Sequence, residues 1–152
     1  MKYPILSVLL LVFTLMVSGC GKTATATPIS PTASTEPLAA EDKASLVAAL
    51  QSSGATVEAG DPISQVFFSP EGSIIKVNGA DVQVFEYESM EAMENDASQV
   101  APDGGSIGTT MVTWMDTPHF YKAGHFIVLY VGSDETILNL LESVLGHQFA
   151  GR

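Results

Sequence analysis

The pattern of hydrophobic and polar positions predicts three amphipathic helices in residues 42–152. Each begins after a residue that caps helices well: Asp42 for the first, Ser89 for the second, and Ser133 or Asp134 for the third. Apolar residues then recur at steps of three and four, which places them on one helix face. The apolar positions are Leu46, Val47 and Leu50, then Met90, Met93, Ala97 and Val100, then Ile137, Leu138, Leu141, Val144 and Leu145.

Polar residues and glycines define the other face and the ends of these helices. The acids of the second helix, Glu91, Glu94 and Asp96, lie between its apolar positions, so we expect them to face solvent. Gly54 and Gly146 follow the first and third apolar stripes, where a residue that tolerates positive φ ends a helix.

Shorter apolar runs between the helices predict strands. Asn78-Gly79 is the strongest hairpin signal, because both residues tolerate the positive φ of a type I′ turn. The run at residues 126–131 is continuously apolar, which is typical of a central strand buried on both faces. The predicted strands are residues 66–68, 74–77, 82–87, 107–114 and 126–131.

Two segments, residues 76–93 and 122–138, share one order of features. Each has a lysine, a glycine turn, a strand that ends in an aromatic residue, and a helix cap followed by a helix. The chain therefore predicts an α+β fold, with two strand-strand-helix units as a hypothesis. We expect an antiparallel sheet of four or five strands, about three helices on one face, and the other face partly open to solvent.

The amino terminus has the pattern of an export signal. Lys2 supplies a positive charge, and residues 5–17 form an apolar run that is too short to span a membrane comfortably. The run ends in Val17-Ser18-Gly19-Cys20, an aliphatic residue, two small residues and a cysteine. This motif closely resembles the lipobox of bacterial lipoproteins.

The resemblance, which covers residues 1–20, implies a processing route and an address. Residues 1–19 would be removed between Gly19 and Cys20, and the Cys20 thiol would carry a diacylglyceryl thioether. Acylation of the freed amine, for instance with palmitate, would add a further chain, and two or three chains anchor a protein stably. We expect a protein held at the outer face of the cell membrane or an outer membrane. The alternatives are an ordinary secretory signal or an uncleaved helix.

The segment after the cysteine is a predicted tether. Residues 20–41 are rich in Thr, Ser, Pro and Ala, and their three prolines favour an extended chain that spans up to about 60 Å. Residues 42–152 then form a single α+β domain. This domain resembles the small uncharacterised domains carried by many envelope lipoproteins, a resemblance that implies no activity.

Charge and cysteine content exclude several classes of protein. The formal net charge is −11, and removal of residues 1–19 makes it one unit more negative because Lys2 is lost with no acid. Nucleic acid would be repelled, so we expect no nucleic-acid partner. Cys20 is the only cysteine, which leaves no disulfide, CxxC pair or cysteine metal cluster within the chain.

The densest group of reactive side chains lies in residues 114–125. Asp116, His119 and His125 would suit zinc with one open position if the segment folded back at Gly124. The segment has no HExxH motif and no histidine pair at helical spacing, so we expect polar or turn histidines and no bound metal or cofactor. In a second interpretation, Trp114, His119, Phe120 and Tyr121 form an exposed aromatic platform for a glycan or peptide.

The sequence favours a protein that is not an enzyme. It has no GxSxG elbow and no SxxK motif, its only thiol is assigned to lipid, and we predict no catalytic residues. The leading hypothesis is an accessory or interaction lipoprotein that binds an envelope protein or glycan. The alternative is a lipoprotein that binds a small ligand or metal in the Trp114–His125 region and presents it to a transporter.

Overall fold

The computed structural model describes residues 42–151, which contain three helices and eight strands. The predicted signal peptide, Cys20 and the predicted tether lie outside the described residues. Among those residues, no helix has the length and apolar character needed to cross a membrane. The elements are α1 (Lys43–Ser52), β1 (Val57–Ile63), β2 (Gly72–Val77), β3 (Ala80–Glu86), α2 (Met90–Ala97), β4 (Ser106–Ile107), β5 (Thr110–Met111), β6 (Pro118–Ala123), β7 (Phe126–Val131), α3 (Glu135–Leu145) and β8 (Ala150–Gly151).

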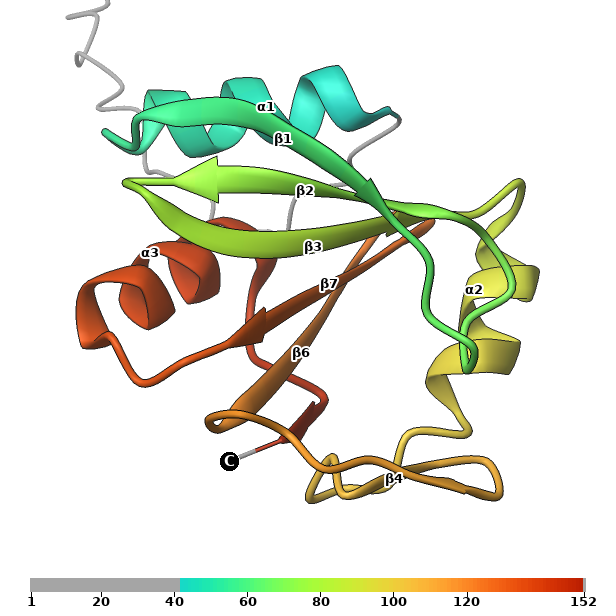
Figure 1. Cartoon of the computed structure of the whole chain (residues 1–152). Coiled ribbons are helices and arrows are strands. Elements are labelled where there is room, and N and C mark those ends of the chain that lie inside the picture. The colour runs from blue at the N-terminus through green and yellow to red at the C-terminus, as the bar shows by residue number, and fades with distance from the viewer. Residues whose placement is uncertain (1–41, 152) are drawn as a thin grey trace, which may run out of the picture. The chain divides into compact units, whose positions relative to one another are not determined.

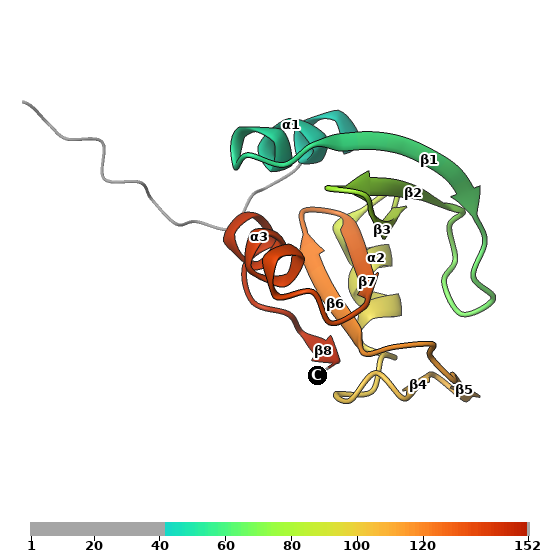
Figure 2. The same ribbon diagram turned by 60° about the vertical axis from the view of Figure 1, so that its left-hand side comes forward.

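The fold is α+β, as the sequence predicts. Six strands form one antiparallel sheet in the order β1-β2-β3-β7-β6-β8, and β4 pairs with β5 in a small separate hairpin (Figures 1 and 2). The main sheet is thus larger than the predicted four or five strands. The difference comes from β1 and from the two-residue β8, both at sheet edges.

Side-chain caps begin all three helices where the sequence predicts them. Asp42 accepts a hydrogen bond from the backbone N–H of Ser45 at 2.7 Å, and Ser89 accepts one from Ala92 at 3.1 Å. At the third helix the cap is Asp134 rather than Ser133, because the Asp134 carboxylate accepts from its own first helical turn. These bonds satisfy backbone donors that have no partner inside a helix.

The helices divide between the two faces of the sheet, which corrects the expectation of three helices on one face. Helices α1 and α3 pack on one face, over a core that includes Val82 and Val128. Helix α2 and the β4–β5 segment cover the other, over Phe85 and Leu129 (Figure 2). The second face is therefore not open. Because β7 is apolar on both sides, each face needs a cover.

Helix α2 buries Met93 and Ala97 as predicted, but two of its other positions differ from the prediction. Asp96, expected in solvent, is 7% exposed, whereas Met90 is 61% exposed. The carboxylate of Asp96 accepts from the backbone N–H of Ser69 at 2.8 Å and from the Tyr87 hydroxyl at 3.0 Å. Hydrogen bonds from two other segments thus hold a carboxylate in the core, where an unpaired one would be costly.

Two predicted strands are wrong, and besides the two-residue β8 two longer strands were missed. Residues 66–68 form a turn, with Val66 93% exposed, and residues 107–114 contain only the two short strands of the β4–β5 hairpin. The two longer missed strands are β1, whose sequence VEAGDPI has few apolar residues, and β6, whose histidine and aromatic residues were assigned to a possible binding site. In each case, pairing with a neighbouring strand decides the conformation.

The two strand-strand-helix units are present in element order, as β2-β3-α2 and β6-β7-α3. Their strands meet at the β3–β7 pair in the middle of the sheet. Helix α2 packs on one face and α3 on the other. A two-fold axis perpendicular to the sheet, which would exchange β3 with β7, would place both helices on one face. The two units are therefore not related by such symmetry.

Candidate functional site

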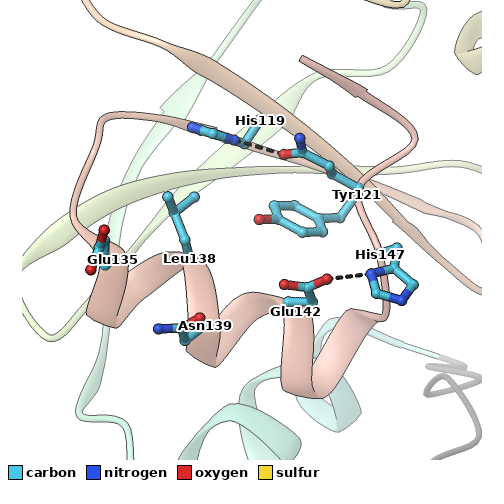
Figure 3. Close-up of a pocket in the computed structure, with 8 residues that line it drawn as sticks. His119, Tyr121, Glu135, Leu138, Asn139, Glu142 and His147 are labelled. Atoms are coloured by element: carbon cyan, nitrogen blue, oxygen red, sulfur yellow. Dashed lines mark hydrogen bonds and ion pairs between the residues drawn. The ribbon is translucent and has the colours of Figure 1, made fainter. Parts of the chain in front are cut away.

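An open cleft lies between α3 and β6 and is here called the α3–β6 cleft (Figure 3). Its volume is about 680 Å³, within the range of small-molecule sites. Strand β6, one face of α3 and the connection to β8 supply its walls. The lining residues are His119, Tyr121, Glu135, Leu138, Asn139, Glu142, His147 and Gln148.

The periods of a strand and a helix explain which residues line the cleft. His119 and Tyr121 are two apart in β6, so both side chains point to the same face of the sheet. On α3, the lining positions 135, 138, 139 and 142 follow the i, i+3, i+4, i+7 spacing of one helix stripe. This stripe flanks the apolar one that packs in the core, and three of its four members are polar.

His119 is buried beneath the cleft and holds a free acceptor. The residue is 5% exposed, its ring stacks on Tyr130, and its Nδ1 lies 2.7 Å from Oε1 of Gln148. Because an amide oxygen only accepts, Nδ1 carries the proton in this arrangement and Nε2 keeps its lone pair. Among residues 42–151, Nε2 of His119 has no hydrogen-bond partner, and because no buried side-chain nitrogen there lacks one, this atom is reached by solvent.

Tyr121 adds a second polar group that is able to form hydrogen bonds with a ligand. The residue is only 2% exposed, and its hydroxyl points into the cleft (Figure 3). The hydroxyl forms no hydrogen bond with any described residue, and because no buried side-chain oxygen in this part of the chain lacks a partner, it is open to solvent in the cleft. Burial, and then the nearby charge of Glu142, raise the pKa of Tyr121 from 10.0 to about 12. The phenol therefore stays protonated at neutral pH, able to donate one hydrogen bond and accept others.

The fixed charges of the lining residues are both negative. Glu135 and Glu142 lie on α3, and neither Lys nor Arg is among the residues that line the cleft. His147, which is 94% exposed, contacts the Glu142 carboxylate through its Nδ1. With neutral imidazoles the cleft carries two negative charges, which favours cationic over anionic ligands.

The candidate metal ligands of the sequence analysis do not come together. His119 and His125 lie at opposite ends of the β6–β7 hairpin, and the Nε2 atom of His125 is 3.5 Å from a carboxylate oxygen of Glu86. Asp116 is exposed and accepts from the Ser133 hydroxyl at 3.4 Å. The part of the chain that the structure describes has no group of three or more metal-binding side chains.

The predicted aromatic platform is wrong as an exposed surface. Phe120 is fully buried on one face of the sheet, and Tyr121 is buried on the other. Strand alternation separates neighbours in this way. Trp114 is half-buried against Phe120, and its indole N–H donates to the carbonyl of Gly104 at 2.7 Å. Of the four residues, only His119 and Tyr121 line the cleft.

A second surface feature is a group of exposed apolar side chains, here called the Met–Val patch. It comprises Val66, Met111 and Met115, which are 93, 87 and 100% exposed. The rings of Phe67 and Trp114 are 6.0 Å apart and join the loop that carries Val66 to the segment that carries Met115. Exposed large apolar residues of this kind are a feature of interaction surfaces.

Comparison with protein-family models, with curated proteins and with solved structures found no match for this chain. The site is therefore argued from its own geometry. The sequence analysis assigned six of the lining residues to no site: Glu135, Leu138, Asn139, Glu142, His147 and Gln148. A signal was present in the polar stripe of the third helix, but a polar stripe on a helix is ordinarily its solvated face.

Proposed function

We propose that this chain is a lipid-anchored, extracytoplasmic binding protein without enzymatic activity, and that the α3–β6 cleft binds a small polar ligand. The proposal takes up the small-ligand alternative of the sequence analysis and moves its site from residues 114–125 to the cleft. One observation carries it: Tyr121 and His119 are almost fully buried as residues, and both line the cleft with a polar atom for which the described residues supply no hydrogen-bond partner.

Buried polar groups in proteins are nearly always paired, either with protein atoms or with ordered water. Here no buried side-chain polar atom of the described residues lacks a partner, so the Tyr121 hydroxyl and the His119 Nε2 atom are within reach of water. Both residues line the same cavity, so one ligand can replace that water. Leu138 adds an apolar contact, and Asn139 adds an amide that both donates and accepts. A mostly formed cavity with a few convergent polar groups is the usual design of a small-ligand site.

The sequence supports both the proposed location at a membrane and the proposed lack of enzymatic activity. The Val17-Ser18-Gly19-Cys20 motif favours lipid attachment, and residues 20–41 are suited to hold the domain away from the membrane. The chain has no motif of nucleophilic or zinc-dependent hydrolases. A ligand bound in the cleft would be available to an envelope transporter, which fits an accessory role.

The anchor is tested by intact mass of the protein purified from bacterial membranes. We expect a chain that begins at Cys20 and carries added acyl mass, and we expect Cys20→Ala to lack that mass and to leave the membrane fraction. An unmodified wild-type chain in the soluble exported fraction would contradict the anchor.

The cleft is tested by thermal unfolding of the full chain in non-ionic detergent with a panel of small metabolites. A ligand at about 100 times its Kd stabilises the folded state by about 2.7 kcal/mol, which is readily measured as a rise in Tm. Tyr121→Phe should reduce that rise because it removes the hydroxyl and little else. If no panel member raises the Tm, or if Tyr121→Phe responds like the wild type, the cleft is not the binding site.

The Met–Val patch favours a second candidate function, the binding of an envelope protein. Methionine side chains adapt to many partner shapes, and Met111 and Met115 are both exposed. Crosslinking in intact cells should then capture one reproducible partner with the wild type and not with Met115→Asp. Equal capture by both proteins would exclude the patch as the contact.

A further inference from the structure

We infer that the ligand of the α3–β6 cleft is a linear di- or polyamine. The inference rests on the proposed function and adds the chemical class of the ligand. It starts from the two carboxylates of the cleft, Glu135 and Glu142, and from the buried residue Tyr121, whose hydroxyl has no partner among the described residues and points into the cleft.

The spacing of the carboxylates matches a molecule with a positive group at each end. Glu135 and Glu142 are seven residues apart on α3, which corresponds to about two turns and about 10 Å along the helix axis. Because seven residues bring the chain back to the same side, both carboxylates border one cleft. An extended chain with terminal ammonium groups can therefore contact both.

The wall between the carboxylates suits a methylene chain. Leu138 lies one turn after Glu135 on the same stripe, and the Tyr121 ring stands opposite (Figure 3). These apolar surfaces can cover the carbon atoms of an alkyl amine while its ends reach Glu135 and Glu142. A compact inorganic cation would leave this apolar wall unused, and the described residues hold no three-ligand metal group.

The unpaired polar atoms also favour a donor-rich ligand. The Nε2 atom of His119 is a hydrogen-bond acceptor when Nδ1 is the donor to Gln148. The neutral hydroxyl of Tyr121 accepts as well, and carboxylates only accept. Ammonium groups only donate, so an amine fits this set of atoms, whereas a carboxylate or phosphate would face two negative charges with no Lys or Arg among the lining residues.

His147 occupies part of the amine site in the free protein. Its ring contacts the Glu142 carboxylate, and it is almost fully exposed on the connection that leads to β8. A terminal ammonium group would displace the imidazole from Glu142. His147→Ala should therefore strengthen the binding of an amine, which a purely structural role for this ring would not predict.

The experiment is isothermal titration of the full chain in non-ionic detergent with spermidine and putrescine, and with 1,4-butanediol as an uncharged analogue. We expect one amine bound per chain and no measurable heat from the diol. Glu135→Gln and Glu142→Gln should each weaken binding about fivefold, the size expected for a partly exposed charge pair. Glu58→Gln makes the same charge change on the exposed edge strand β1, and it should leave binding unchanged.

Three results would overturn the inference. If Glu58→Gln weakens amine binding as much as the cleft variants do, the amines respond to the general negative charge of the chain. If a neutral or anionic molecule binds with dependence on the Tyr121 hydroxyl while the amines do not bind, the amine class is wrong and the proposed function still holds. If neither amines nor any panel member binds, the proposed function fails with it.

Discussion

At the scale of single residues, a few buried polar side chains connect segments that are distant in sequence. Asp96 on α2 receives hydrogen bonds from the backbone of Ser69 and from the hydroxyl of Tyr87. Burial, followed by the charge of Asp96, holds the pKa of Tyr87 well above its usual value. One carboxylate oxygen thus attaches both the loop after β1 and the end of β3 to α2.

The first prediction concerns this carboxylate. Asp96→Ala should lower the free energy of unfolding by about 3 kcal/mol, because two buried donors lose their acceptor. Asp96→Asn can keep an oxygen at the same place, and its loss should be about 1 kcal/mol. Urea unfolding followed by circular dichroism measures both. Equal losses would mean that charge, rather than the two hydrogen bonds, is what the site requires.

The second prediction concerns the alkaline stability of the fold. The pKa of Tyr121 is about 12 in the folded protein and near 10.0 when the residue is unfolded. The raised value means that its contribution to stability is complete below pH 10 and is lost as the pH rises toward 12. Wild-type stability should fall more steeply over this interval than that of Tyr121→Phe. Parallel pH profiles in urea unfolding would contradict the assignment.

At the scale of elements, the β2–β3 hairpin depends on its turn. Asn78 and Gly79 both have positive φ, +50° and +87°. The side-chain oxygen of Asn78 also accepts from the backbone N–H of Thr56 at 2.8 Å, which links the turn to the segment before β1. The predicted type of turn therefore aligns two strands of the sheet and also holds the start of a third.

The third prediction tests this turn. Gly79→Ala should cost about 1 kcal/mol, because an alanine is strained at this positive φ. A Cβ atom at this position meets no other atom within 4 Å, so no steric clash adds to that cost. Gly79→Asn should cost less, since asparagine tolerates this conformation better. Urea midpoints of the three proteins give the comparison. A loss of several kcal/mol for Gly79→Ala would point to a steric clash that the structure does not contain.

At the scale of the whole molecule, negative charge dominates. The chain has 17 acidic residues and six basic ones. Two exposed ion pairs, Lys76 with Asp81 and Lys122 with Glu94, offset only part of the resulting repulsion. The acids therefore repel one another across the surface, and salt screens this repulsion.

The fourth prediction follows from this excess of acids. Raising sodium chloride from about 20 mM to about 300 mM should increase the Tm by a few degrees, because the Debye length shortens. Differential scanning calorimetry measures the shift. A Tm that falls with added salt would show that the surface ion pairs contribute more than the general repulsion.

Local sequence signals determined the parts of this protein that depend on neighbouring residues. The caps at Asp42 and Ser89, the Asn78-Gly79 turn and the apolar run of β7 are read within a few positions, and the structure contains all of them. The lipobox at residues 17–20 is equally local and stays a prediction. In each case a few neighbouring residues favour the cap, turn or strand by themselves, without contacts from the rest of the chain.

Only the tertiary structure decided which surfaces meet. It placed α2 opposite α3, buried Asp96 under Ser69 and Tyr87, and paired β6 with β7 and β8. It also brought the polar stripe of α3 beside His119 and Tyr121, which forms the cleft. These contacts join residues far apart in the chain, and their free energy depends on the surface that each segment buries against another. No single segment carries that information.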